Sequence, residues 1–224
     1  MGKKYKLTDE TIEHNKHTLH RIQALKDFGN VKKSEVGGYI ESEDNLSQKG
    51  NCWIYGNAKV YGQAYICGEA CLSEYAEIFG EAYICGEACI SEYAKIFGKA
   101  FVHGSANVCG KAQIYDNAHV VDDARIFNQA KVYENALVCG NSLLYDNAKV
   151  YGVAWIHDNA CIYGNAWIYG NAEVYGQSQI YDYAQVYGLS QIYGSAKVFG
   201  NAEIGGNAEV SSIQDFIVFK NKLE

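Results

Sequence analysis

Several side chains that could do chemistry recur at intervals of eighteen residues. Cys67, Cys85 and His103 form one such series, and Cys71 and Cys89 form a second. Thiolates and imidazoles are the usual ligands of zinc, so each series could supply part of a metal site. Whether the side chains of a series converge on one point depends on the elements that carry them.

The sequence between residues 54 and 210 follows a period of six. Every sixth residue from Ile54 to Val210 is Ile, Val or Leu, and no insertion interrupts the series. Two positions before each aliphatic residue after Ile54 stands Ala, replaced only by Ser142, Ser178 and Ser190. Residues two apart on a strand point to the same side, so each hexad predicts a short strand with two inward side chains. Because six residues do not fit the spacing of a helix, an array of amphipathic helices is excluded.

Turn-forming residues stand two positions after each aliphatic residue. Most are Gly, and the others are Asp, Asn, Glu or Ser. Gly, Asn and Asp tolerate the positive φ that a sharp corner needs. Three hexads with their corners make one triangular coil of eighteen residues, in which residue i stacks on residue i+18. Residues 64–81 and 82–99 differ at only three positions, which fits two successive coils.

The pattern predicts an all-β fold, a single-stranded parallel β-helix of about nine coils over residues 51–212. At roughly 4.8 Å per coil the rod would be on the order of 40 Å long. The open ends of such a rod expose core residues and strand edges. We therefore expect an N-terminal cap in residues 1–50 and a C-terminal cap in residues 213–224, where the tail SSIQDFIVFKNKLE is rich in apolar residues.

Residues 5–28 allow two local structures. Four residues, Leu19, Ile22, Leu25 and Phe28, stand near helical spacing, whereas the stretch EHNKHT, residues 13–18, is typical of a hairpin turn. We favour the hairpin. On a helix His14, His17 and His20 would form a possible metal cluster, but we expect solvent-exposed histidines.

Composition restricts the partners and the compartment. The net charge is −7, and residues 51–224 account for it with ten Lys/Arg against eighteen Asp/Glu. An acidic rod does not favour nucleic acid, whose phosphates need Lys and Arg. No apolar run is long enough to span a membrane, and the N-terminus lacks the apolar core of a signal peptide. We expect a cytoplasmic protein without nucleic-acid or membrane partners.

One outward column of the predicted coils is aromatic at eight successive positions. Its members, called the Tyr61 ladder, are Tyr61, Phe79, Phe97, Tyr115, Tyr133, Tyr151, Tyr169 and Tyr187. Offset-stacked aromatic pairs contribute roughly 0.5–1.5 kcal/mol each beyond burial. We expect the ladder to stabilise the rod; the alternative is a flat strip for sugars, bases or a partner protein.

A second face of the rod is apolar in both of its outward columns. One column contains Tyr65, Tyr83, Phe101, His119, Leu137 and Trp155. The other contains Cys67, Cys85, His103, Val121, Cys139 and His157, and the face turns polar at Glu173 and Gln191. So large an apolar patch is normally covered. We expect another subunit, in a homodimer or homotrimer, to cover it, with the N-terminal segment or a ligand as alternatives.

The coil geometry disfavours a metal in either cysteine series. Zinc needs ligands that converge at about 2.0–2.3 Å, whereas parallel rungs hold side chains side by side at roughly 4.8 Å. Seven of the eight cysteines occupy outward positions, and Cys52 occupies an inward position of the Ala type. We predict no metal site and no disulfide, with the outward cysteines serving as small surface residues.

The hexads resemble the left-handed β-helix hexapeptide-repeat family, which includes trimeric acyltransferases and carbonic anhydrases of the gamma class. The stretch DFGNVKKSEVGGYIESEDNLSQKGNCWIY, residues 27–55, looks like the segment that leads into the coils of YdcK-type proteins, a hexapeptide-repeat group of bacteria and prophages. The resemblance implies left-handed coils. It also implies that an acyltransferase of this fold would place a histidine near a groove between subunits.

Two hypotheses of function follow. The first is a non-catalytic binding or scaffolding rod, encoded by a phage or prophage, that self-associates and presents an acidic, aromatic-lined surface to a protein partner such as a host protein that it inhibits. It needs no cofactor. The second is an acyl- or acetyltransferase that uses acyl-CoA, with His103 or His157 as general base. The uninterrupted hexads offer no projecting loop to shape an acceptor pocket, and His103, His119 and His157 are spread too far apart for a zinc site, so the first hypothesis is favoured.

Overall fold

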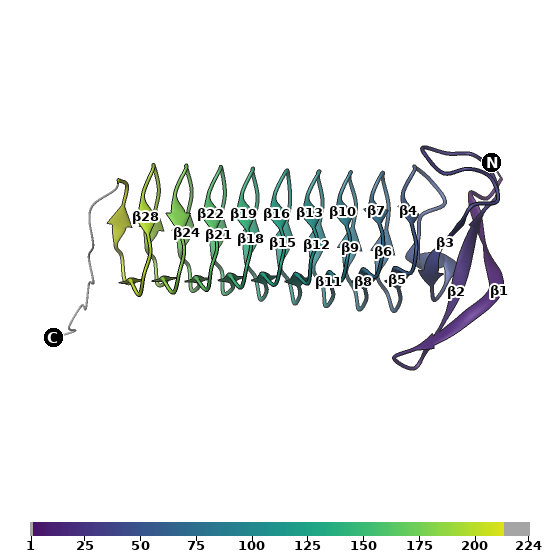
Figure 1. The fold of residues 1–224 in the computed structure, drawn as a ribbon, viewed down its shortest axis with the longest axis horizontal. Helices are drawn as coiled ribbons and strands as arrows, with labels where there is room; N and C mark the ends of the chain where they lie inside the picture. The colour runs from purple at the N-terminus through teal and green to yellow at the C-terminus, as the bar shows by residue number, and fades with distance from the viewer. Residues whose placement is uncertain (1, 213–224) are drawn as a thin grey trace.

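The computed structural model describes residues 2–212, which form a rod of stacked coils with a β-hairpin at its N-terminal end (Figure 1). Three parallel sheets run along the rod, and each coil adds one two-residue strand to each sheet. The predicted all-β fold with eighteen-residue coils is confirmed. The tail 213–224, expected to form a C-terminal cap, lies outside the described residues.

Each sheet is named here by its first strand in the repeat. The β4 sheet contains β4 (Trp53–Ile54), β7 (Cys71–Leu72), β10 (Cys89–Ile90), β13 (Asn107–Val108), β16 (Arg125–Ile126), β19 (Leu143–Leu144), β22 (Cys161–Ile162), β25 (Gln179–Ile180) and β28 (Lys197–Val198). The β5 sheet contains β5 (Lys59–Val60), β8 (Glu77–Ile78), β11 (Lys95–Ile96), β14 (Gln113–Ile114), β17 (Lys131–Val132), β20 (Lys149–Val150), β23 (Trp167–Ile168), β26 (Gln185–Val186) and β29 (Glu203–Ile204). The β6 sheet contains β6 (Tyr65–Ile66), β9 (Tyr83–Ile84), β12 (Phe101–Val102), β15 (His119–Val120), β18 (Leu137–Val138), β21 (Trp155–Ile156), β24 (Glu173–Val174), β27 (Gln191–Ile192) and β30 (Glu209–Val210).

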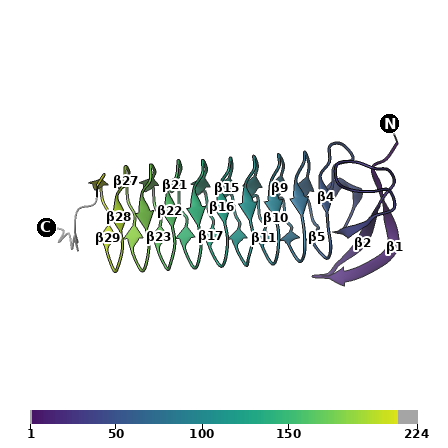
Figure 2. The ribbon, with the colours of Figure 1, turned by 45° about the horizontal axis from the view of Figure 1, so that its top comes forward.

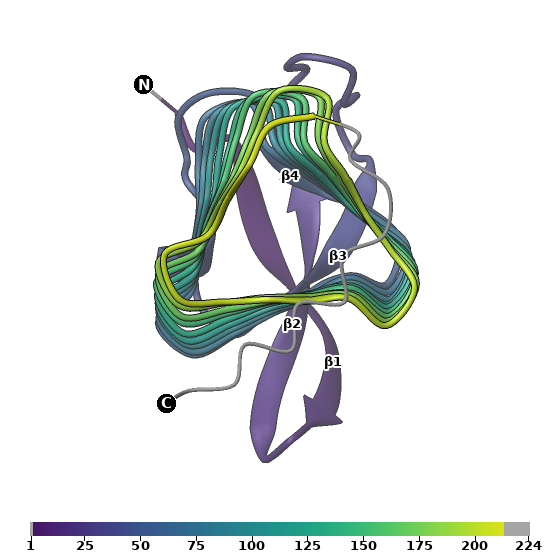
Figure 3. The same cartoon turned by 90° about the vertical axis from the view of Figure 1, so that its left-hand side faces the viewer.

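Seen along its axis, the rod has three sides that meet at corners (Figure 3). The chain winds clockwise as it advances toward the viewer of Figure 3, which makes the coil left-handed. Neighbouring strands keep a register of eighteen residues, so that Cys71 lies opposite Cys89. Backbone N–H groups donate to carbonyls of the next coil, as Tyr55 does to Leu72 at 2.7 Å.

The core of the rod is the predicted double row of Ala and aliphatic residues. Both rows are fully buried along most of the rod, and Cys52 is buried at the position of the first Ala. Ser142, Ser178 and Ser190 are also fully buried. Each of these hydroxyls donates to the carbonyl three residues earlier, at 2.6–2.8 Å, and this bond offsets the cost of burying it.

The corners adopt the left-handed backbone conformation that the sequence predicts. The glycines of the repeat have φ between 59° and 76°, and the Asp, Asn and Glu residues that replace them have φ between 56° and 59°. Several of these carboxylates accept a hydrogen bond from the backbone N–H one coil later; Asp122 accepts from Gly140 at 3.1 Å. A non-glycine corner therefore gains an inter-coil bond that partly offsets its backbone strain.

The N-terminal segment is a hairpin, which excludes the helical alternative. Strands β1 (Tyr5–His14) and β2 (His17–Ala24) pair antiparallel around a turn at Asn15 and Lys16 (Figure 2). The register shifts between Arg21 and Gln23 and again on β1, so the alternation of buried residues is interrupted. Leu19 and Ile22 are both buried although they are three residues apart, because Leu19 packs in a cluster with Tyr39 and Tyr61 while Ile22 packs in the core of the rod.

Strand β3 (Val36–Ile40) connects the hairpin to the rod. It pairs antiparallel with β2 and parallel with β5, so the β5 sheet continues through β3 and β2 to β1. A short 3-10 helix, η1 (Glu43–Asn45), follows. Trp53 closes this end of the core and packs edge-on against the rings of Tyr5 and Phe28. No helix within residues 2–212 is long and apolar enough to cross a membrane.

Candidate functional site

The Tyr61 ladder is continuous along the β5 sheet. Successive ring centroids lie 4.8–5.1 Å apart with interplanar angles of 1–12°. The β-strand spacing sets this distance, which is close to that of stacked rings. After Tyr61 the rings are half-buried against one another, and the ladder is therefore a stabilising element whose outer edges reach the surface.

The hairpin covers the first rung of the ladder. The rings of His14 and His17 pack on Tyr61 at centroid distances of 5.6 and 4.9 Å. The expectation that these histidines are simply exposed to solvent is wrong, because the hairpin turn lies over Tyr61 and brings His17 within 2.9 Å of Glu41. The N-terminal segment thus covers part of the β5 sheet.

A buried carboxylate joins the hairpin to three coils. Glu77 is only 6% exposed. Its Oε1 accepts a hydrogen bond of 2.6 Å from the Tyr61 hydroxyl and lies 2.6 Å from Nε2 of His14, while its Oε2 lies 2.7 Å from Nζ of Lys95. Burial raises the pKa of the Glu77 carboxyl, but the hydrogen bonds from Lys95, Tyr61 and His14 outweigh burial and lower the pKa to about 2. Glu77 is therefore ionised and holds these groups together.

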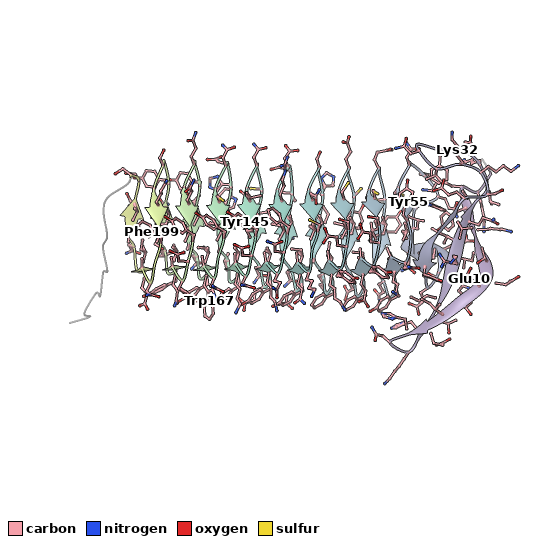
Figure 4. All side chains as sticks on the ribbon, in the orientation of Figure 1. Glu10, Lys32, Tyr55, Tyr145, Trp167 and Phe199 are labelled. Atoms are coloured by element: carbon pink, nitrogen blue, oxygen red, sulfur yellow. The ribbon has the colours of Figure 1, made fainter. Side chains whose placement is uncertain are left out.

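A second aromatic ladder follows the β4 sheet in the C-terminal half of the rod. It contains Phe127, Tyr145, Tyr163, Tyr181 and Phe199, with ring centroids 4.8–5.2 Å apart. Figure 4 shows Tyr145 and Phe199 on the same side of the rod. This ladder was not among the features predicted from the sequence, although its residues also recur every eighteen positions.

The β6 sheet carries the predicted apolar face. Among the large apolar side chains of this face, Tyr83 and Trp155 are the most exposed, at 38% and 44%. The ring of Tyr83 lies 5.5 Å from that of Phe101 and 5.7 Å from that of Tyr65, and the ring of Phe101 lies 5.4 Å from that of His119. The side chains form a continuous surface over six coils, from β6 to β21.

The cysteines of the β6 face lie among these rings. Cys67 points outward but is buried, because its Sγ contacts the Tyr83 hydroxyl at 3.2 Å. Burial raises the pKa of the Cys67 thiol to about 11. On the same face Nε1 of Trp155 donates to Sγ of Cys139 at 3.3 Å. Within residues 2–212, no three His, Cys, Asp or Glu side chains converge as a metal site would require.

The two histidines considered as general bases have different surroundings. His103 is exposed and lies 5.7 Å from the Phe101 ring. His157 is packed between the rings of Trp155 and Tyr175, at 4.5 and 4.9 Å. Three coils separate the two histidines, so they do not share one site.

Two carboxylates orient His157. Its Nε2 lies 3.1 Å from Oε1 of Glu173, and its Nδ1 lies 3.4 Å from Oδ1 of Asp158. Gln191 donates to the other oxygen of Glu173 at 3.1 Å. An imidazole held by a fixed carboxylate can accept and return a proton, so His157 has the better geometry for acid–base chemistry.

A groove runs along the corner between the β4 and β5 sheets. One part has a volume of about 590 Å³ and the next about 420 Å³, and both parts are lined by Asn147 and Asn165. The corner column of the groove contains Tyr93, Lys111, Gln129, Asn147, Asn165 and Tyr183. Trp167 of β23 lies beside it, at the lower edge of the rod in Figure 4. These residues were not predicted from the sequence as a site.

The fold and these surfaces define an all-β parallel solenoid with eighteen residues per coil, and no family model matches the chain. A stretch of 37 residues is 49% identical to the protein named uncharacterized acetyltransferase YdcK of Escherichia coli (strain K12). The stretch covers 16% of this chain and 11% of that protein, so the chain matches only a small part of the length of this relative. The similarity is distant and partial.

Proposed function

We propose that the protein is a non-catalytic binding rod that associates with further copies of itself through the β6 face and serves as a scaffold for a protein partner. The observation that carries the proposal is the continuous apolar surface from Tyr65 to Trp155. Exposed apolar patches of this kind normally contact another macromolecule. The polar residues Glu173 and Gln191 end the surface at the next coils.

Charge supports self-association through this face rather than another. The two outward columns over the six coils contain no Lys, Arg, Asp or Glu, although the chain has a net charge of −7. Burying a charged side chain in an interface carries a large desolvation penalty, and the cores of interfaces are accordingly depleted in charge. Two acidic rods can therefore approach one another here without burying ionised groups from these columns.

Measuring the mass of the protein in solution tests the proposal. Light scattering and native mass spectrometry of the full chain should give a dimer or trimer, and Trp155→Glu should reduce it to a monomer. Trp167→Glu on the β5 sheet is the matched control, because Trp167 is also exposed, at 37% against 44% for Trp155. A wild-type monomer at tens of micromolar, or an oligomer unchanged by Trp155→Glu, would refute self-association through the β6 face.

An acyltransferase using acyl-CoA is the second candidate. Two observations favour it, namely the contact of His157 with Glu173 and the partial similarity to a protein named an acetyltransferase. His157 would then be the general base, on the face where subunits meet. Calorimetry with acetyl-CoA tests this candidate: binding that His157→Ala changes and His103→Ala does not would support it, and the absence of binding by the oligomer would exclude it.

A further inference from the structure

Two exposed tyrosines bound the corner groove, and polar side chains line its floor. Tyr93 and Tyr183 stand in the same corner column, five coils apart, and are 55% and 63% exposed. Between them the column holds Lys111, Gln129 and the two asparagines that line both parts of the groove. At roughly 4.8 Å per coil, the two tyrosines are about 24 Å apart along a straight line.

The floor offers paired hydrogen-bond donors and acceptors. Nδ2 of Asn147 donates to Oδ1 of Asn165 at 3.3 Å. An amide has two N–H donors and an oxygen with two lone pairs, so this bond leaves capacity on both side chains. Gln129 and Gln185 add two more amides at the edge of the groove. Groups that donate and accept side by side match hydroxyl groups, each of which also donates and accepts.

The charges lining the groove are balanced. Lys111 and Lys149 are positive, and Glu92 and Asp146 are negative. Asp146 is already engaged, because its Oδ2 accepts from the backbone N–H of Gly164 at 3.2 Å and its Oδ1 accepts from Asn128 at 3.1 Å. A groove without net charge does not attract a polyanion. Its occupant should be a neutral molecule.

Aromatic rings flank the polar floor. Tyr93 and Tyr183 lie at the two ends, and Trp167 lies on the side, where Nζ of Lys149 covers its ring at 4.4 Å from the centroid. Aromatic side chains with a polar tip combine apolar contact area with hydrogen bonding. Sugar rings present both C–H surfaces and hydroxyl groups, so they match this mixture of rings and amides better than an apolar ligand does.

From this arrangement we infer that the corner groove binds a linear, neutral, β-linked oligosaccharide lying parallel to the rod axis. The amides of Asn147 and Asn165 contact its hydroxyl groups, Tyr183 packs on one of its rings, and the edge of Trp167 borders the chain. The linkage expected is β-1,4, since β-1,4-linked chains are extended and fit a straight groove, whereas α-1,4- and β-1,3-linked chains coil. The site lies away from the β6 face and does not depend on self-association.

Binding of tetrasaccharides to the full chain tests the inference. Cellotetraose and chitotetraose are the extended probes, and maltotetraose is the coiled comparison. In calorimetry and saturation-transfer NMR, at least one extended probe should bind more tightly than maltotetraose. Tyr183→Ala and Asn165→Ala should each weaken that binding about tenfold, a size typical of losing one ring contact or one hydrogen bond.

The matched control is Tyr75→Ala. Tyr75 belongs to the same corner column, is 49% exposed and lies one coil outside the groove, stacked on Tyr93. Its removal should leave binding unchanged. The inference is overturned if neither extended probe binds at millimolar concentration, if maltotetraose binds equally well, or if Tyr75→Ala weakens binding as much as Tyr183→Ala. Circular dichroism of each variant separates loss of binding from loss of fold.

Discussion

The hydroxyl of Tyr61 donates a hydrogen bond of 2.6 Å to Oε1 of Glu77 in the following coil. Both side chains are buried, and His14 of the hairpin approaches the same carboxylate oxygen. Lys95, one further coil along, neutralises the charge from the other side. The hairpin and the start of the rod are therefore joined by one ionised group.

The Glu77 carboxyl should make stability depend on pH in the acid range. Its pKa falls from an ordinary 4.5 to about 2 on folding. The resulting stabilisation, about 3 kcal/mol, is complete above the ordinary pKa and is lost as the pH falls from about 4.5 to 2. Thermal unfolding between pH 7 and 2 should show the gap between wild type and Glu77→Gln closing over this window. Glu81→Gln, at an exposed carboxylate, should follow the wild type; a constant gap for Glu77→Gln would contradict the assignment.

Removing one ring from the middle of the Tyr61 ladder should weaken the rod locally. Tyr133 stacks on Tyr115 at 4.9 Å and on Tyr151 at 4.8 Å. Tyr133→Ala removes both contacts and should cost about 1–3 kcal/mol, whereas Tyr133→Phe keeps the ring and should cost less than about 0.5 kcal/mol. Hydrogen exchange of the amides near residue 133 measures the difference. Equal protection in the two variants would show that stacking contributes nothing.

Alanine at a glycine corner should lower the free energy of unfolding more where there is less space around the glycine. A Cβ on Gly104, where φ is +74°, would lie 2.7 Å from the backbone N and O of Asp122. A Cβ on Gly56, where φ is +59°, would lie 3.4 Å from its nearest neighbour. Each substitution places an alanine at positive φ, which costs roughly 1–2 kcal/mol, and the clash at Gly104 adds to this cost. Denaturant unfolding should therefore give Gly104→Ala a lower free energy of unfolding than Gly56→Ala. The reverse order would contradict the corner geometry.

Cysteine labelling should reveal which surfaces are covered. Cys52 is fully buried, and burial raises the pKa of its thiol, so it should resist iodoacetamide until the protein unfolds. Cys89 is exposed on the β4 sheet and should react at the same rate in wild type and Trp155→Glu. Cys85 lies on the β6 face and should react faster in the variant, because the interface is lost. Mass spectrometry of labelled peptides follows all three, and identical rates for Cys85 would argue against an interface there.

The repeat could be predicted from the sequence because one rule applies to every coil. Each aliphatic residue from Ile54 onward has the same neighbours above and below, so the period alone identifies the inward side. The hairpin was harder to predict, since Leu19 and Ile22 are both buried at helical spacing, Leu19 against Tyr39 and Tyr61 and Ile22 in the core of the rod. Handedness depended on the resemblance to left-handed β-helices, because a six-residue period is compatible with either hand.

The surfaces were predicted unevenly. The Tyr61 ladder and the β6 face follow directly from columns of eighteen-residue spacing. The second ladder was not predicted, because its column becomes continuously aromatic only at Phe127. The column begins with Tyr55, Ser73, Ser91 and Cys109. The depth of the corner groove depends on the relative lengths of side chains in neighbouring coils, such as Tyr93 beside Lys111. A periodic pattern of residue types does not predict that depth.

Because the eighteen-residue register is uninterrupted, the length of the rod can change in steps of one whole coil. Residues 64–81 and 82–99 occupy equivalent places, so deleting one copy would keep the strand register and the aliphatic core. Among the side-chain contacts, the ion pairs Glu77–Lys95 and Glu81–Lys99 between the two copies would be lost. Genetic gain or loss of such a unit would shift the two ends of the rod by roughly 4.8 Å without redesigning the core. A recent duplication of one coil would leave two near-identical copies side by side, as residues 64–81 and 82–99 are in this chain.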